Sequence, residues 1–321
     1  MTRVVRTLAA TYGVEPVCQT LGVATSTHYA RQNRTPSARD LRDRELVREI
    51  RDARAGYRQV YGQRKTWREL RRRGVQVGRD RVARLMRQEG LSGIRRGRGV
   101  RTTRPEAAAD RARDLVERRF CADQPNQLWV ADMTYVRTYS GFVYLAVILD
   151  VFSRRIVGWQ IASHMRTELV MDALEMAVAT RMPGRGLIAH TDRGSQYTSL
   201  AYTDRLDELG IAPSVGSRGD AYDNAMAESF VATFKSELVA GRRFPGLEHA
   251  EHEALAWIGF YNAERLHEEL GDIPPAEFEA MFLDDQLPGR EAPAEAGRPA
   301  LSGGAPSGLG QTTIPDPVSA T

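Results

Sequence analysis

The sequence predicts a mixed α/β protein, in which a five-stranded mixed sheet with flanking helices is preceded by small all-α modules. After residue 120, β-type runs bounded by turns are followed by alternating helical and strand patterns. Before residue 120, apolar residues recur at spacings of three and four, which is typical of amphipathic helices. The length of 321 residues with 42% hydrophobic content allows one sizeable core and one or two small modules.

The composition also argues against several classes of protein. The longest apolar run, at 142–152, is interrupted by Asp150 and falls short of the roughly 20 residues that a membrane span needs. The N-terminus has only short apolar pieces, so we expect no signal peptide. Cys18 and Cys121 lie far apart without CxxC spacing, which argues against a disulfide framework or a structural zinc site. We therefore expect a cytoplasmic protein with no membrane partner.

The first predicted module covers residues 1–35. A short helix from residue 14, a turn at 21–23 and a second helix that begins near Thr25 or Ser26 form a helix-turn-helix outline. Any small helical hairpin gives the same pattern, so DNA contact by this module and a purely structural role are equally supported.

The second predicted module covers residues 36–104 and carries the positive charge. Between residues 31 and 104 there are 24 Lys or Arg against 8 Asp or Glu, a net charge of +16, which leaves −12 for the rest of the chain. Helical patterns run from residue 38 to 90, with arginines between the apolar positions. A protein that binds the phosphate backbone has this character, although a solvated helix surface has it too. The arginines that we expect to bind DNA are Arg64, Arg68, Arg79, Arg81 and Arg84, with Arg95 and Arg96 in a flexible basic linker at 93–104.

A connector at 105–119 leads to the α/β region at 120–284. The expected strands are 127–138, 142–151, 156–163, 187–191 and 212–215. The expected helices are 167–181, 199–209, 223–239 and 250–265. Residues 285–321 are mostly Pro, Gly, Ala and Ser with few bulky apolar side chains, so we expect a disordered tail.

Three acidic residues stand where a metal site could be built: Asp132, Asp192 and Glu228. Asp132 lies in the middle of an apolar strand, where an unpaired carboxylate is costly. Asp192 lies in a loop that leaves a strand and enters a helix, where α/β folds often place ligands. Each acid alone is more often a cap, a turn residue or a surface charge, but the three together with their local sequences favour a shared site.

Phosphoryl transfer between DNA strands is a reaction that suits such a site. It needs two divalent ions about 3.5–4 Å apart, held by carboxylates, to activate the attacking oxygen and stabilise the leaving one. Oxygen ligands favour Mg²⁺ or Mn²⁺ over zinc.

The expected helix around Glu228 presents a polar face. Asn224, Glu228 and Lys235 fall on one side of it, opposite an apolar stripe, so Lys235 can meet a DNA phosphate beside the metal ions. Of the 45 basic residues only Lys65 and Lys235 are lysines, so we interpret a lysine at this place as functional.

The region from 120 to 278 resembles the retroviral-integrase-type catalytic core of the insertion-sequence transposases whose second reading frame encodes an Asp-Asp-Glu domain. The matching pieces are WVADMTYV around Asp132, HTDRGSQYTS around Asp192 and GDAYDNAMAESFVATFKSEL around Glu228. The interval of 35 residues between Asp192 and Glu228, with Lys235 seven residues later, is typical of that family. YNAERLHEELGDIPPAEF resembles its closing motif, with Leu266 and Glu268 where Pro and Ser are usual. YGQRKTWREL and RVARLMRQEGL resemble the helix-turn-helix segment that precedes the core.

The resemblance implies a ribonuclease-H-like fold, a catalytic Asp132–Asp192–Glu228 triad that holds two Mg²⁺ or Mn²⁺ ions, and cleavage and strand transfer at terminal inverted repeats. The implied partners are the element ends, target DNA and the product of an upstream frame, in some cases joined as a frameshift fusion. Because strand transfer brings two ends together, we expect a multimer on DNA, associated with the nucleoid.

Auxiliary roles near the triad are assigned to a further set: His190, Asn224, Gln196 and Tyr197. His190 either orients a phosphate or metal-bound water or is simply hydrogen-bonded at a strand end. Two rival interpretations remain, a catalytically silent DNA-binding relic or repressor and a structure-selective nuclease of the same fold. The intact acids argue against the first, and the front modules and closing motif argue against the second.

Overall fold

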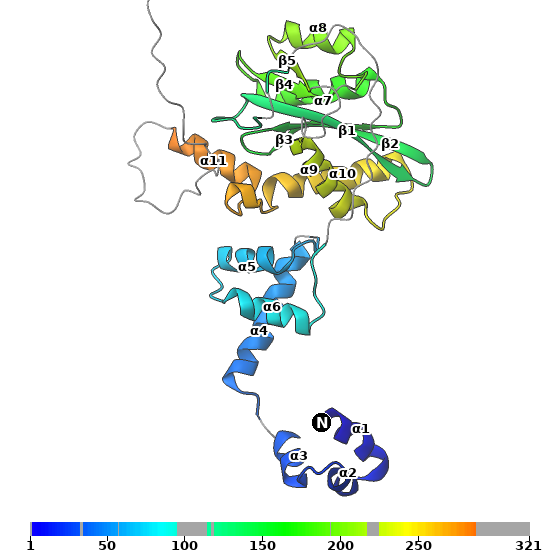
Figure 1. Cartoon of the computed structure of the whole chain (residues 1–321), viewed down its shortest axis with the longest axis vertical. Helices are drawn as coiled ribbons and strands as arrows, with labels where there is room; N and C mark the ends of the chain where they lie inside the picture. The colour runs from blue at the N-terminus through cyan, green and yellow to red at the C-terminus, as the bar shows by residue number, and fades with distance from the viewer. Residues whose placement is uncertain are drawn as a thin grey trace, which may run out of the picture. The chain divides into compact units, whose positions relative to one another are not determined.

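The structure is a computed structural model that describes residues 2–32, 35–56, 58–94, 114–116, 119–192, 194–216 and 225–286. The chain divides into two compact units, Met1–Ile94 and Arg95–Thr321, drawn in Figure 1. Arg95, Arg96, Asn224 and nearly all of the expected tail at 285–321 lie outside the described residues.

The N-terminal helices are α1 (Thr2–Tyr12), α2 (Val14–Thr20) and α3 (Thr25–Gln32). The sequence pattern predicts α2 and α3 but not α1. Val5 on α1 packs with Val17 and Cys18 on α2 in a small core, so α1 supplies the apolar partner that a two-helix hairpin lacks. Cys18 is a buried free thiol.

The basic module is built from α4 (Ala38–Gly56), α5 (Gln63–Arg72) and α6 (Arg79–Gln88). Its core contains Leu46 and Ile50 from α4, Leu70 from α5, and Val82 and Leu85 from α6. These are the apolar positions at spacings of three and four, buried where the three helices meet.

One arginine of this module is structural. Arg54 is only 5% exposed, and its guanidinium donates to the backbone carbonyls of Tyr61, Gln59 and Ser92. It therefore ties the end of α4 to the loop before α5 and to the segment after α6.

In the second unit, the described residues form one five-stranded sheet in the order β3-β2-β1-β4-β5. The strands are β1 (Leu128–Thr138), β2 (Gly141–Asp150), β3 (Ile156–Ala162), β4 (Ile188–Thr191) and β5 (Ala212–Val215). β1, β2 and β3 pair antiparallel, whereas β4 pairs parallel with β1 and β5 parallel with β4. The predicted mixed α/β fold with a five-stranded mixed sheet is confirmed.

Helices cover both faces of the sheet. Figure 1 shows α7 (Thr167–Arg181) and α8 (Leu200–Glu208) on one side, and α9 (Ala225–Phe234) and α10 (Leu247–Ala263) on the other. The first layer buries Trp129, Leu174 and Tyr202 in a shared core. The second is aromatic, with the ring of Phe230 edge-on to those of Trp257 and Tyr261. Trp129 is 1% exposed.

The expected helix at 223–239 changes its geometry partway. The α-helical part ends at Phe234, and Lys235–Val239 form a π-helical turn, η1. Single π-helical turns are often found at functional sites. After α10 come a short 3₁₀ turn, η2 (Glu268–Leu270), and the helix α11 (Pro275–Asp285).

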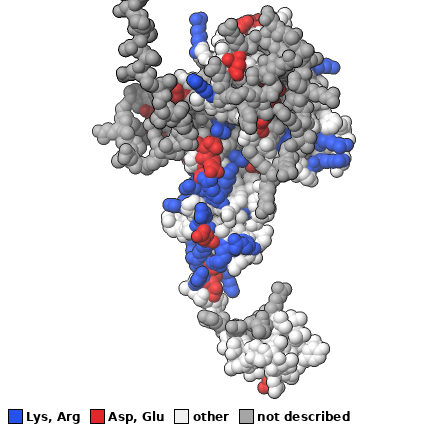
Figure 2. Space-filling model, viewed as in Figure 1, with Lys and Arg blue, Asp and Glu red and all other residues white. Residues whose placement is uncertain are grey.

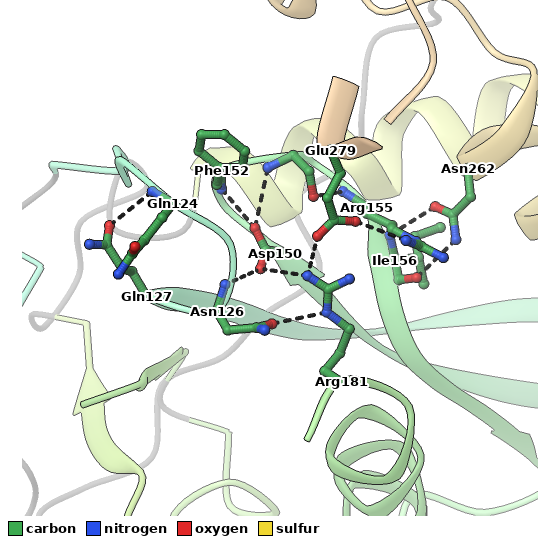
Figure 3. Close-up of polar contacts among 11 residues, drawn as sticks. Gln124, Asn126, Gln127, Asp150, Phe152, Arg155, Ile156, Arg181, Asn262 and Glu279 are labelled. Atoms are coloured by element: carbon green, nitrogen blue, oxygen red, sulfur yellow. Dashed lines mark hydrogen bonds and ion pairs between the residues drawn. The ribbon is translucent and has the colours of Figure 1, made fainter. Parts of the chain in front are cut away.

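A buried polar network fastens α11 to the end of the sheet (Figure 3). Glu279 of α11 is 2% exposed and accepts hydrogen bonds from Arg155, before β3, and from Arg181, at the end of α7. Arg181 also donates to Asn126 and lies 3.8 Å from the Asp150 carboxylate at the end of β2. Elements far apart in sequence are therefore held together at one edge of the fold.

Among the described residues, no helix combines the length and the apolar character that a membrane crossing requires.

Candidate active site

The sheet register brings two of the three predicted acids side by side. β1 and β4 run parallel, and Ala131 of β1 is the partner of Thr191 of β4. Asp132 and Asp192 each follow one member of this pair, so Asp132 within β1 stands at the same level as Asp192, the first residue after β4. Their backbone surroundings supply donors, since Met133 N–H donates to Asp132 Oδ1 at 2.7 Å and Gly194 N–H to Asp192 Oδ1 at 2.9 Å.

Burial and nearby negative charge raise the pKa of Asp132. Burial, the charge of Asp192 and the charge of Glu228 together raise the pKa of Asp132 to about 7, against the hydrogen bond from Met133 and the charge of Lys235. Burial also raises the pKa of Asp192, although the hydrogen bond from Gly194 and the charge of His190 oppose it. The protein therefore compensates only part of the cost of keeping Asp132 and Asp192 ionised.

Glu228 and Lys235 come to this place from the helical layer. Glu228 lies in the first turn of α9 with its side chain exposed, and its charge reaches Asp132. Lys235 is the first residue of η1 and is partly buried, and burial lowers its pKa while the charge of Asp132 acts to raise it. The predicted triad and its lysine are thus brought into one electrostatic neighbourhood.

The donors present suit a hard divalent cation. Asp132, Asp192 and Glu228 offer only carboxylate oxygens, the ligands that Mg²⁺ and Mn²⁺ prefer. A cation between them would relieve the repulsion that raises the pKa of Asp132. Within the described part of the chain, no three His, Cys, Asp or Glu side chains are drawn together closely enough to form a finished metal site.

The other predicted residues lie in the interior or at its edge. His190 is 1% exposed, with Nδ1 at 2.9 Å from Ser214 Oγ and its ring edge-on to Phe120. Gln196 donates to the carbonyl of Met165 at 3.0 Å. Tyr197 is 5% exposed and packs edge-on against Tyr202.

Two residues that the sequence analysis did not select also belong to this neighbourhood. Gly194 supplies the N–H for Asp192, and a Cβ at this position would lie 3.0 Å from Asp192 Oδ1 and 3.5 Å from Tyr197 Cδ2. The signal for it is a glycine two residues after the acid. Tyr135, three residues after Asp132, has its ring 4.7 Å from Lys235 Nζ, and nothing in the local sequence announces that contact.

The chain matches known protein families and relatives. Residues 122–221 and 209–275 match two family models, each described as an integrase core domain, and residues 40–99 match one described as an HTH-like domain. A putative transposase for the insertion sequence element IS986/IS6110 of Mycobacterium tuberculosis is 47% identical over 266 residues, covering 81% of this chain and 96% of that protein. A transposase for the insertion sequence element IS629 of Shigella sonnei is 48% identical over 276 residues, covering 84% and 93%.

The chain belongs to the insertion-sequence transposases with an integrase core domain. The predicted family and the predicted enzyme class, a polynucleotidyl transferase, are confirmed. Among solved structures, the catalytic core of the HTLV-2 integrase in complex with magnesium is similar with a TM-score of 0.40 and 15% identity, covering 50% of this chain and 99% of that one.

In the transposase, the arginines expected to bind DNA differ in their surroundings. Figure 2 shows Lys and Arg gathered over α4–α6 on the face that it draws. Asp43 of α4 lies 2.7 Å from Arg81 Nε and 2.7 Å from Arg84 Nη2, so these two arginines of α6 share one carboxylate. The Arg68 guanidinium lies 4.9 Å from the Trp67 ring, and the Arg79 side chain is 65% exposed.

Proposed function

We propose that this transposase cleaves and joins DNA strands at the terminal inverted repeats of an insertion sequence, using Asp132, Asp192 and Glu228 as its catalytic acids. The observation that carries the proposal is the β1–β4 register, which sets Asp132 and Asp192 on neighbouring parallel strands. The charge of Glu228 acting on Asp132 supports it as the third member.

The three carboxylates would hold two Mg²⁺ or Mn²⁺ ions, which activate the attacking oxygen and stabilise the leaving oxygen of a phosphodiester. Because the pKa of Asp132 is about 7, this carboxyl is partly protonated at neutral pH in the metal-free protein, and a cation bound beside it would favour the ionised form. Lys235 would hold a DNA phosphate, because its ammonium is a compact charge next to the carboxylates. Water, or a 3′ hydroxyl in strand transfer, attacks phosphorus in line as the bond to the leaving 3′ oxygen breaks.

The basic module would supply affinity for DNA that does not depend on the reacting phosphate. Arginines of α4–α6, together with Arg95 and Arg96, would neutralise backbone phosphates of the element ends and of target DNA. We further propose that the transposase acts in the bacterial cytoplasm, bound to the nucleoid. It would act there as a multimer, with the upstream-frame product as a partner or as a fused segment.

Strand cleavage and joining on a labelled duplex that carries the flanking element end tests this function. The wild type is compared with Glu228→Gln in the presence of Mg²⁺, with the upstream-frame product added to every reaction. Glu251→Gln is the matched control, because it makes the same change at an exposed glutamate of α10. We expect cleavage by the wild type and the control, and none by Glu228→Gln.

The same experiment distinguishes an active transposase from a catalytically silent DNA-binding protein. If all three proteins bind the element end equally well and none cuts it under any of these conditions, the assignment as an active transposase fails. If Glu228→Gln cuts as fast as the wild type, the chain is a nuclease or transferase that uses other acids.

A further inference from the structure

Exposed aromatic side chains gather at the closed end of the β1–β2 hairpin. Tyr135, Tyr139 and Phe142 are 38%, 73% and 49% exposed. Tyr135 and Arg137 alternate along β1, so they share one face, and Phe142 is the cross-strand partner of Arg137 on that face. Tyr139 lies in the turn between the two strands. We call Tyr135, Arg137, Tyr139, Phe142 and Lys235 the hairpin patch.

The packing of the patch leaves ring surface open on one side only. The rings of Tyr135 and Phe142 meet edge to face, with centroids 5.4 Å apart and planes at 86°. On the other face of the hairpin Val136, Thr138 and Val143 are buried, so the hairpin is fixed from beneath. A flat ligand could therefore lie on rings that are already held in place.

Positive charge accompanies these rings. Lys235 Nζ lies 4.7 Å from the Tyr135 centroid, and Arg137 is exposed and has no ion-pair partner among the residues that the structure describes. Aromatic rings interleaved with cations are the surface that unpaired nucleobases and their phosphates bind. An apolar protein partner would not require the cations.

Lys235 links the patch to the carboxylates of the proposed active site. Tyr135 lies three residues beyond Asp132 on the same strand, about 10 Å at the usual rise of a β-strand, and because successive side chains alternate, the two stand on opposite faces of β1. Lys235 belongs to both places, because its charge acts on Asp132 while its ammonium lies over Tyr135. A DNA strand whose phosphate meets Lys235 would therefore have a neighbouring base within reach of the rings.

We propose that the hairpin patch stacks an unpaired base of the DNA strand that is cut, next to the reacting phosphate. This inference rests on the proposed function, since it takes the ligand to be a DNA end. Stacking would hold the last base pairs open and so expose the phosphodiester to attack, because the cost of unpairing is offset by contact with the rings.

The test compares two DNA ends bound by the full-length chain. One duplex carries the element end fully paired, and the other has the same end with its last two pairs mismatched. All proteins carry Glu228→Gln and are measured in the absence of metal, so no cleavage is needed. We expect the parent to bind the mismatched end about tenfold more tightly than the paired one. The double variant Tyr139→Ala/Phe142→Ala should lose that preference and bind paired DNA as before.

Two further variants make the result specific. Phe142→Trp alone should keep the preference, because it retains an aromatic surface. Leu200→Ala, at a side chain 80% exposed on α8, is the control for removal of a surface apolar group and should also keep it. Equal circular dichroism spectra and melting temperatures would show that each variant is folded.

The proposal is overturned if the double variant retains the tenfold preference, or if the parent shows none. It is also overturned if the double variant changes only the sedimentation of the free protein, because the patch is then a contact between copies of the chain. A third outcome separates the two proposals. If the wild type never cleaves DNA, but the parent prefers the mismatched end and the double variant does not, the proposed function fails and the hairpin patch remains a base-binding surface.

Discussion

Lys235 Nζ lies 4.7 Å from the centroid of the Tyr135 ring, so the first residue of η1 is joined to β1 beside Asp132. The other lysine, Lys65, stands in a similar relation to Tyr61 in the basic module, at 5.6 Å. A ring beneath an ammonium restricts its position without neutralising its charge, which leaves the charge available to a phosphate. The two lysines therefore form a natural pair for testing which positive charge acts in catalysis.

Lys235→Met should lower the rate of strand cleavage about 100-fold at saturating DNA, because a positive charge is lost at the reacting phosphate. Lys65→Met makes the same substitution in the basic module. It should weaken DNA binding and leave the cleavage rate at saturating DNA unchanged. Single-turnover rates measured over a range of DNA concentrations separate the two effects. Equal saturated rates for Lys235→Met and the wild type would remove Lys235 from the chemistry.

Asp132→Asn should stabilise the metal-free protein at alkaline pH while it abolishes cleavage. The folded-state pKa of Asp132, about 7, exceeds the ordinary value of 3.8, so folding is favoured by the protonated carboxyl. That stability is fully present below about pH 4 and is lost as the pH rises through 7. The melting temperature of the variant should therefore exceed that of the wild type by a margin that grows between about pH 4 and about pH 7 and stays constant above it.

Mg²⁺ provides the internal check on this result. It should raise the melting temperature of the wild type at pH 8 and leave Asp132→Asn nearly unchanged, because the cation offsets the repulsion that the variant lacks. Asp207→Asn makes the same change at an exposed aspartate in the last turn of α8. It should behave as the wild type both in the pH series and on addition of Mg²⁺. A margin that shrinks with rising pH would contradict the raised pKa.

Glu279→Gln should destabilise the second unit by about 3 kcal/mol at neutral pH, since the buried partner of Arg181 and Arg155 is removed. Burial acts to raise the pKa of Glu279, but the hydrogen bonds from the two arginines outweigh it, and the pKa is lowered from 4.5. The stabilisation is present above pH 4.5 and is lost as the pH falls through the lower folded value. Urea unfolding at pH 7 and pH 4 should therefore show a cost that shrinks in acid, and a constant cost would point to packing instead.

Gly158→Ala tests the contact between β3 and α7. A Cβ at this position would lie 2.2 Å from the carbonyl oxygen of Ala173 and 2.7 Å from Ala177 Cβ, so the helix must move. Overpacking against backbone should cost about 3 kcal/mol in the free energy of unfolding. Gly184→Ala, which meets nothing within 4 Å, is the control and should unfold at the wild-type urea concentration. Equal midpoints for the two variants would show that α7 adjusts freely.

The acids could be found from the sequence because each breaks a local pattern. Asp132 interrupts an apolar strand, and Asp192 follows one, so the parallel pairing of β1 with β4 was enough to bring them together. Glu228 could be identified only from its position on an expected helix and from its interval of 35 residues after Asp192, which is typical of the family. Its approach to the strands depends on the packing of α9, which the sequence pattern does not show.

The features that escaped prediction depend on contacts between distant segments. Arg54 has the same charge as its neighbours on α4, and only the carbonyls of Tyr61 and Ser92 make it structural. For His190 the sequence leaves two roles open, and only the contacts of its ring with Ser214 and Phe120 show how it is held in the interior. The π-helical turn at Lys235 and its contact with Tyr135 arise where a helix end meets a hairpin, which periodicity alone does not encode.

Asp43→Asn should strengthen nonspecific DNA binding if Arg81 and Arg84 contact phosphates. Asp43 lies 2.7 Å from both guanidinium groups. The hydrogen bonds from Arg84 and Arg81 hold the pKa of Asp43 below its ordinary value, although burial acts to raise it. Removing its charge frees both arginines for phosphate. The slope of log affinity against log salt concentration should therefore steepen by about one to two.

Asp52→Asn adds the same charge elsewhere on α4, at an exposed aspartate, and controls for the general gain in positive potential. It should raise affinity slightly without changing the slope by a whole phosphate contact. Titrations of a random-sequence duplex between 50 and 200 mM salt, the interval over which phosphate contacts weaken binding most visibly, distinguish the two variants. Identical slopes would mean that Arg81 and Arg84 serve to pack α6 on α4, and that Arg68 and Arg79 are the better candidates for the DNA-binding surface.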